Sequence, residues 1–178
     1  MNTTKLQAGS QFPAIVVNNI EERRRDLALP EGGHDWMMVV VYRGRHCPMC
    51  TAYLNELENY RQELSDIGVD LAAVSGDNAE QLSAHMTQLD VSFPLFFGLS
   101  IDQMKSLGLY ISDPRSPQET DHPFAEPGLF VINEQGNIQV VDISNNPFVR
   151  PAIKTLVSGL KWIRDPKNNY PIRGTYPY

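Results

Sequence analysis

The only two cysteines of the chain, Cys47 and Cys50, enclose one proline and one methionine. They come four residues after the apolar, valine-rich run at residues 36–42 and directly precede a helical pattern. A strand that leads into a helix places the first cysteine at the helix N-terminus, where unpaired backbone N–H groups and the positive end of the helix dipole favour a thiolate. We therefore expect thiol redox chemistry at this pair.

Cys47 is the predicted nucleophile. Attack on a peroxide or a disulfide requires a thiolate, whereas a free cysteine is mostly protonated at neutral pH. Pro48 suits the first helical position, because the N–H that proline lacks has no partner there in any case. Arg43, Arg45 and His46 place positive charge close to Cys47 in the sequence, which also favours its thiolate form.

Cys50 is the predicted resolving cysteine. It follows within one helical turn, so it can attack a sulfenic acid or a mixed disulfide on Cys47 and close an intramolecular disulfide. Two cysteines can also be small core residues or metal ligands. A structural zinc site uses four Cys or His ligands, and His34, His85 and His122 show no paired spacing, so we expect no metal and no other cofactor.

Strand and helix patterns alternate along the chain. Strands are predicted at residues 14–19, 36–42, 69–74, 93–97, 128–133 and 137–143, and helices at residues 50–67, 78–89, 101–109 and 153–163. The last two strands form an antiparallel hairpin, and the strand at 93–97 suits an edge. The pattern predicts an α/β sandwich with a mixed sheet, in one domain over residues 1–178.

Three segments are predicted to lie outside this alternation. Residues 20–29 read as a polar turn or helical piece, in which the three arginines at 23–25 form a solvated face balanced by two glutamates. Residues 111–126 read as a polar connection. Residues 165–178 form a surface tail whose tyrosines cover their own domain or meet a second copy in a homodimer.

Composition restricts the kinds of partner and the cellular compartment that we expect for this chain. With 42% hydrophobic residues in 178, the chain can bury one sizeable core. Its net charge of −6 repels nucleic acid and anionic membranes, so proteins or small molecules are the expected partners. No apolar run approaches the roughly 20 residues of a spanning helix, and the first nine residues lack a signal pattern. We expect a cytoplasmic protein.

The chain resembles the thioredoxin fold and, more narrowly, the AhpC/TSA group of peroxiredoxin-like proteins, in the branch that carries CPxC. The resemblance spans residues 8 to 164 and rests on segments at 8–13, 42–50, 74–77, 128–136 and 150–151. It implies a thioredoxin-like three-layer α/β/α sandwich with a central mixed sheet. It also implies an antioxidant oxidoreductase that is reduced by a thioredoxin- or glutathione-type thiol.

Several positions depart from that resemblance. Typical peroxiredoxins hold a threonine three residues before the peroxidatic cysteine and a proline seven before, where this chain has Gly44 and Val40. Their transition-state arginine corresponds in position to Pro127. Pro127 instead matches the cis-proline of thioredoxin-like proteins, and we predict a cis bond there. Thioredoxin is not matched fully either, since Val41 and His46 replace its buried acid and its tryptophan.

Arg43 and Arg45 are candidates to replace the missing arginine. Because strand residues alternate faces, both side chains can point to the same side. At least one of them would bind a peroxide or polarise the thiolate, the alternative being a solvated surface charge. His46 is more often a solvent-facing neighbour than a catalytic base.

Three functions follow from these residues. In the first, Cys47 attacks a hydroperoxide, becomes a sulfenic acid and condenses with Cys50. In the second, Cys47 attacks a protein disulfide and Cys50 resolves the mixed disulfide, as in a thiol–disulfide oxidoreductase. In the third, the pair is a non-enzymatic redox sensor that alters a partner surface.

Overall fold

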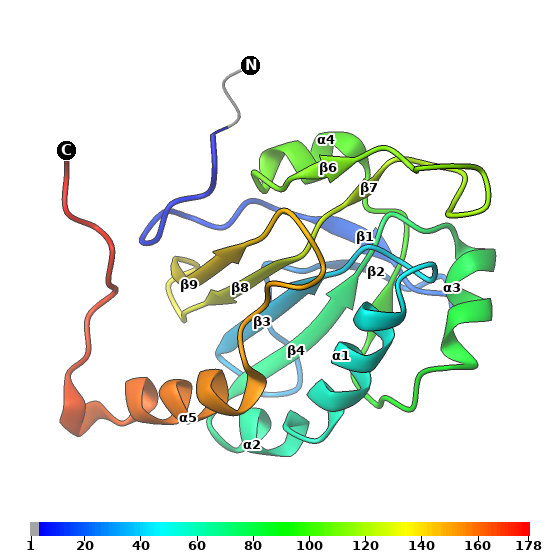
Figure 1. Ribbon diagram of the computed structural model, residues 1–178. Helices are drawn as coiled ribbons and strands as arrows, with labels where there is room; N and C mark the ends of the chain where they lie inside the picture. The colour runs from blue at the N-terminus through cyan, green and yellow to red at the C-terminus, as the bar shows by residue number, and fades with distance from the viewer. Residues whose placement is uncertain (1–3) are drawn as a thin grey trace.

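The computed structural model describes residues 4–178 and has a five-stranded mixed sheet at its centre (Figure 1). The strand order is β5-β4-β3-β8-β9. The strands are β3 (Trp36–Val41), β4 (Val69–Val74), β5 (Leu95–Phe96), β8 (Gly128–Ile132) and β9 (Ile138–Ile143). β3, β4 and β5 are parallel, whereas β8 is antiparallel to both β3 and β9. The predicted sandwich, edge strand and hairpin are confirmed.

Helices and a small hairpin cover the two faces of this sheet. The core on one face includes side chains of α1 (Pro48–Glu58), α2 (Arg61–Asp66), α3 (Ala79–Met86) and α5 (Ile153–Arg164). The core on the other face is closed by α4 (Ile101–Ser106) and by β1 (Val16–Asn18), which pairs with β2 (Arg24–Asp26). Two further short strands, β6 (Ile111–Ser112) and β7 (Phe124–Ala125), pair with each other above the sheet in Figure 1.

β3 holds the start of the cysteine segment in place. Its side chains alternate between the two cores, Met38 and Val40 on one side, Met37 and Val39 on the other. All six residues of β3 are buried, as expected for a central strand covered on both faces. The end of β3 is therefore a rigid point from which residues 42–46 lead into α1.

The prediction for residues 20–29 is wrong in part: turns are present at 20–21 and 27–28, and Arg23 and Arg24 are exposed. However, Arg24–Asp26 form the strand β2, and Arg25 is 5% exposed rather than solvated. Its guanidinium contacts the carboxylate of Asp70 at 2.6 Å, and Arg23 pairs instead with Glu31. A buried arginine is tolerated when a carboxylate partners it, but a partner on another strand leaves no local pattern.

Two other segments differ from their predictions. The single helix expected at residues 50–67 is divided into α1 and α2, with Asn59 and Tyr60 between them. The connection expected at 111–126 contains β6 and β7. Asn78 caps α3 as predicted, through a reciprocal pair of bonds with Gln81.

The C-terminal segment runs along the outside of the molecule beyond α5 (Figure 1). A short 3₁₀ helix, η1 (Pro166–Asn168), follows α5. The ring of Tyr170 then packs edge-on against Trp162 at 5.1 Å, whereas Tyr176 and Tyr178 are exposed. In residues 4–178 no helix is long and apolar enough to cross a membrane.

Candidate active site

Cys47 lies at the N-terminus of α1, and Pro48 occupies the first helical turn. The backbone N–H of Cys50 donates a hydrogen bond to the Cys47 Sγ at 3.2 Å. The Cys47 carbonyl accepts the N–H groups of Cys50 and Thr51. The N–H of Cys50, in the first turn of α1, is thus shared between the Cys47 carbonyl and the Cys47 sulfur.

This environment favours the thiolate of Cys47. Hydrogen bonding from the Cys50 thiol is the largest cause that lowers the pKa of Cys47, to about 6. The Cys50 backbone N–H and the charges of Arg150 and Arg43 lower this pKa further, while burial opposes the change. A thiol with a pKa near 6 is mostly ionised at pH 7, which is the condition for nucleophilic attack.

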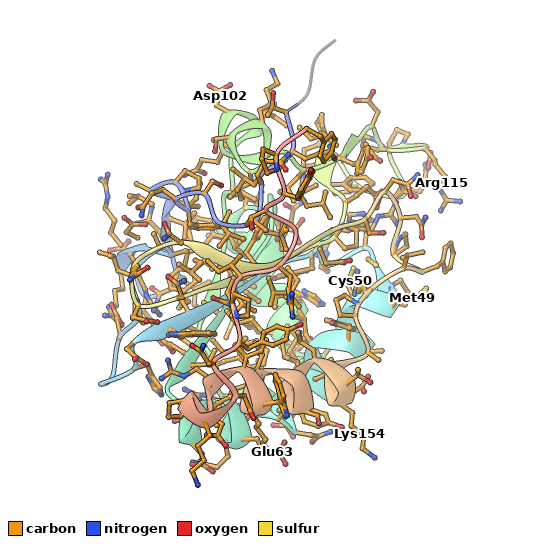
Figure 2. All side chains as sticks on the ribbon, turned by 90° about the vertical axis from the view of Figure 1, so that its left-hand side faces the viewer. Met49, Cys50, Glu63, Asp102, Arg115 and Lys154 are labelled. Atoms are coloured by element: carbon orange, nitrogen blue, oxygen red, sulfur yellow. The ribbon has the colours of Figure 1, made fainter. Side chains whose placement is uncertain are left out.

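Cys50 is held in the opposite protonation state. Its side chain is fully buried, and burial, followed by its hydrogen bond to Cys47, raises the pKa of the Cys50 thiol. Both cysteines are free thiols in this structure. Figure 2 shows Cys50 and Met49 at the start of α1, and Met49 is 43% exposed. The pair therefore combines one nucleophilic sulfur with one protonated sulfur.

Arg150 is the residue of this site that the sequence did not single out. Its guanidinium lies 2.6 Å from the Cys50 Sγ. The same guanidinium lies over the ring of Tyr53, 5.0 Å from its centroid, and the Tyr53 hydroxyl donates to the carbonyl of Pro151. In the sequence, Arg150 marks only the start of the last predicted helix. Because it lies 100 residues from Cys50, no local pattern indicates the contact between them.

Arg43 faces the residues before β8 rather than solvent. It forms an ion pair of 3.2 Å with the buried Glu126, and its guanidinium lies 4.6 Å from the ring centre of Phe124. Its charge also lowers the pKa of Cys47. The neighbouring His46 packs on the same Phe124 ring at 4.4 Å. Burial lowers the pKa of His46, so it does not supply the positive charge expected of it at neutral pH.

Arg45 contributes to the structure of the turn before Cys47 through its backbone rather than its side chain. Its side chain is exposed, but its N–H donates to the Oδ2 of Asp77 at 2.7 Å. Asp77 is 1% exposed and follows β4. Gly44 lies directly beneath this carboxylate with φ of +136°, and a Cβ built there would come within 2.5 Å of the Asp77 Oδ1. The Asp77 carboxylate therefore occupies the space of any side chain at position 44.

We predict that Gly44→Thr, which restores the threonine typical of peroxiredoxins, destabilises the protein. The substitution strains a positive φ and forces Asp77 away from the Arg45 N–H, at a combined cost of about 2–4 kcal/mol. Urea unfolding measures this change in the free energy of unfolding. A variant as stable as the original chain would contradict the packing of Asp77 over Gly44.

The cis bond predicted at Pro127 is wrong, because every peptide bond in residues 4–178 is trans. Glu126 and Pro127 are the two residues between β7 and β8. The N–H of Ser144 donates to the Pro127 carbonyl, and that of Glu126 donates to Tyr110. Pro127 lines a small cavity that Arg150 and Tyr53 also line.

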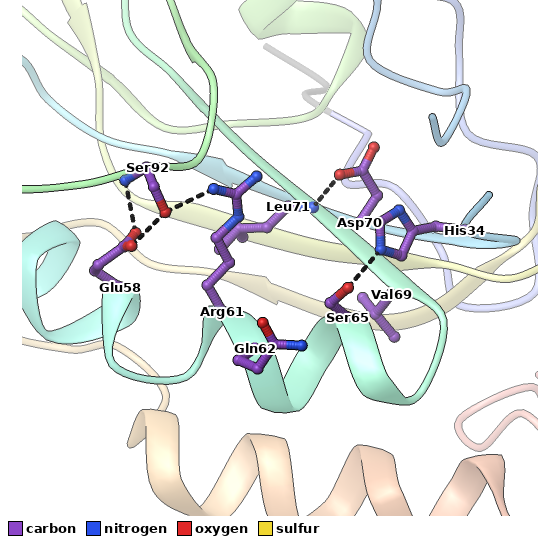
Figure 3. Close-up of a pocket in the computed structure, with 9 residues that line it drawn as sticks. All are labelled: His34, Glu58, Arg61, Gln62, Ser65, Val69, Asp70, Leu71 and Ser92. Atoms are coloured by element: carbon purple, nitrogen blue, oxygen red, sulfur yellow. Dashed lines mark hydrogen bonds between the residues drawn. The ribbon is translucent and has the colours of Figure 1, made fainter. Parts of the chain in front are cut away.

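A second, more polar hollow lies at the other end of the sheet (Figure 3). It has a volume of about 290 Å³ and includes residues 69–71 at the start of β4. His34 bonds to Ser65 there, and Arg61 bonds to Ser92. These hydrogen bonds link α2 to neighbouring segments. The cysteines lie at the opposite end of the parallel strands β3 and β4. Residues 4–178 contain no group of three His, Cys, Asp or Glu side chains placed to hold a metal ion.

Comparison with known protein families assigns the chain to one of them. The AhpC/TSA family profile matches residues 8–141, about three quarters of the sequence. The chain belongs to the AhpC/TSA family. This membership supports the thiol-dependent peroxidase and antioxidant function expected from the sequence, and the protein is an oxidoreductase. No curated protein matches it in sequence.

Several solved structures share this fold. A peroxiredoxin-like protein from Aquifex aeolicus is 14% identical, with a TM-score of 0.72 over 89% of this chain and 88% of its own. Peroxidoxin BcpB from Mycobacterium tuberculosis is 13% identical, with a TM-score of 0.72 over 90% and 99%. AhpC from Enterococcus faecalis is 14% identical, with a TM-score of 0.70 over 97% and 99%. At these identities the likeness shows the peroxiredoxin form of the thioredoxin-like fold.

Proposed function

We propose that this AhpC/TSA protein reduces hydroperoxides by cycling Cys47 and Cys50 between a dithiol and a disulfide. The Cys47 thiolate attacks one peroxide oxygen, the O–O bond breaks, and the alcohol or water leaves with a proton. The sulfenic acid on Cys47 then condenses with the Cys50 thiol, which releases water and forms the disulfide. Two electrons from an external thiol pair restore the dithiol.

The observation that carries this proposal is the state of the Cys47 sulfur. It is held as a thiolate at the start of α1, with the residue only 2% exposed. A peroxide of a few atoms needs a smaller opening to reach such a sulfur than a protein disulfide does. A protein disulfide must align three sulfur atoms in a row, which requires the site to open first. The burial therefore favours the small substrate.

Arg150 and Arg43 supply the positive charge in this mechanism. The family arginine is absent at Pro127, but these two guanidiniums both lower the pKa of Cys47. Arg150 also contacts the sulfur of Cys50. Placed there, a guanidinium stabilises the negative charge that develops on the leaving oxygen of the peroxide. The chain thus replaces one arginine by two from other segments.

The reductant, compartment and assembly are parts of the same proposal. A dithiol protein of the thioredoxin type, or a glutathione-type thiol, would reduce the Cys47–Cys50 disulfide, since the cycle needs an external electron source. A reducing cytosol supplies such thiols. A homodimer would bury the exposed tyrosines of residues 165–178.

One alternative is a thiol–disulfide oxidoreductase that acts on protein disulfides. It is favoured by Gly44 and Pro127, which replace the threonine and the arginine typical of peroxiredoxins. The raised pKa of Cys50 also fits this role, because a protonated second cysteine leaves time for a mixed disulfide to form. A redox sensor without turnover is the remaining alternative.

Rapid mixing of the reduced protein separates these functions. Hydrogen peroxide consumption and insulin disulfide reduction are measured side by side at neutral pH. Fast loss of peroxide with slow insulin reduction supports the peroxidase. Fast insulin reduction with slow loss of peroxide supports the thiol–disulfide oxidoreductase. Slow reactions in both assays support the redox sensor.

A further inference from the structure

An apolar patch lies beside the cysteine pair and has no part in the proposed attack on peroxide. Phe148 is 76% exposed and Val149 is 58% exposed, directly before Arg150 in the chain. Met49, between the two cysteines, is also exposed and is labelled next to Cys50 in Figure 2. With the exposed apolar residues next to them, the patch comprises Pro48, Met49, Ala52, Phe148, Val149 and Ala152.

Direct contacts join the two segments that carry this patch. The Arg150 guanidinium lies 2.6 Å from the Cys50 Sγ, and the Tyr53 hydroxyl donates to the Pro151 carbonyl at 2.9 Å. The two halves of the patch are therefore neighbours in space, although 100 residues separate Arg150 from Cys50. Isolated apolar side chains are common on protein surfaces, whereas a group of them in one place marks a binding surface.

The two segments that form the patch carry only positive charges. Residues 43–55 and 143–164 contain no aspartate or glutamate, although the whole chain has a net charge of −6. Their exposed cations include Arg45 and Lys154. Interfaces commonly have an uncharged centre and a polar rim, and the charges of the two rims are complementary. This patch therefore fits a partner that presents an apolar surface with acidic residues around it.

We propose that this patch is the docking surface for the reductant of the Cys47–Cys50 disulfide, and that the reductant is a dithiol protein with an acidic rim around its own cysteines. The proposal rests on the proposed disulfide cycle. A small thiol would need a concave site. The cavity that Arg150 lines has a volume of only about 10 Å³. A phenylalanine that is 76% exposed encloses no small ligand, but a protein surface can cover it.

The reduction consists of two thiol–disulfide exchange steps. A thiolate of the partner attacks the Cys47 Sγ, the Cys47–Cys50 bond breaks, and its electron pair passes to the Cys50 sulfur, which takes up a proton. The partner's second thiolate then attacks the partner sulfur of the mixed disulfide and releases Cys47 as a thiolate. The partner leaves as a disulfide, so two electrons reach this chain. Cys47 is a good leaving group in the second step because its pKa is about 6.

Docking at the patch also gives the partner access to the sulfurs. In the reduced protein Cys47 is 2% exposed, and Arg150 contacts the fully buried Cys50. Exchange requires three sulfur atoms in a row, so the residues over the pair must move. Phe148 and Val149 immediately precede Arg150, so a partner that binds them can use its binding energy to move this segment. A small thiol makes no such contact.

The test starts from the Cys47–Cys50 disulfide formed with diamide, and it measures reduction by thioredoxin and by dithiothreitol through alkylation of the new thiols. Phe148→Ala should slow reduction by thioredoxin roughly tenfold and leave reduction by dithiothreitol within about twofold. Lys154→Glu should slow thioredoxin about threefold at low salt and less at high salt. Leu29→Ala, which changes an exposed apolar side chain in the segment after β2, should alter neither rate.

Equal thioredoxin rates in Phe148→Ala and Leu29→Ala would overturn the proposal. So would a disulfide that thioredoxin does not reduce, or one that glutathione reduces just as fast. A change of oligomeric state in Phe148→Ala would assign the patch to a second copy of the chain, and a loss confined to apolar hydroperoxides would assign it to the substrate. If the original chain consumes no peroxide, the proposed function fails, while the disulfide rates still decide the docking surface.

Discussion

Cys47→Ser should lose peroxide reduction by at least roughly 1,000-fold, because a serine hydroxyl at this position is not ionised and cannot take up the peroxide oxygen. Cys50→Ser should still complete the first step, since its change leaves the Cys47 sulfur at the start of α1. The second variant should therefore consume about one peroxide per chain and stop at a sulfenic acid.

Dimedone labelling followed by mass spectrometry locates that sulfenic acid. The adduct should form on Cys47 in Cys50→Ser, whereas the unchanged protein should form the Cys47–Cys50 disulfide and little adduct. Serine keeps a hydroxyl that can still donate to the Cys47 sulfur, so Cys50→Ser preserves the kind of hydrogen bond that lowers the pKa of Cys47. Turnover that survives in Cys47→Ser would remove this sulfur from the mechanism.

Arg150→Met should slow the reaction of Cys47 with hydrogen peroxide by roughly 10- to 100-fold. Methionine has a similar length but no charge, so the contact with the Cys50 sulfur is lost and the pKa of Cys47 rises. Part of the loss should remain at high pH, where Cys47 is ionised in any case, because the guanidinium also stabilises the departing oxygen. Stopped-flow rates across pH separate the two contributions.

Two further variants serve as references for this result. Arg150→Lys keeps the charge without the planar fork and should recover part of the rate. Arg173→Met removes an arginine that lies over Tyr170 in the C-terminal segment and should leave the rate unchanged. If Arg150→Met reacts as fast as Arg173→Met, the two-arginine account of the site is incorrect.

Local patterns in the sequence predicted the elements that position Cys47. The apolar run of β3 and the helical period of α1 are properties of short segments, and so is the place of a cysteine between them. Asn78 as the cap of α3 belongs to the same class. Such signals depend only on neighbours in the chain, although the break between α1 and α2 at Asn59 and Tyr60 did not show in the helical period.

Contacts between distant segments were not predictable in the same way. Arg150 reaches Cys50 across 100 residues, and Asp77 reaches the Arg45 N–H across 32. Arg25 meets Asp70 on another strand, which turned an expected surface residue into a buried one. Nothing in the spacing of these residues indicates which segments the fold brings together. The resemblance to a family helped with the fold, but its cis-proline did not transfer to Pro127.

The central claim is that Cys47 is a thiolate at neutral pH. Titration of the thiolate absorbance near 240 nm in the reduced protein, with Cys47→Ser as the blank, measures its pKa directly. The account predicts ionisation with a pKa of about 6, and a second thiol, Cys50, that stays protonated to much higher pH. An ordinary thiol pKa of about 8.5 for Cys47 would contradict it.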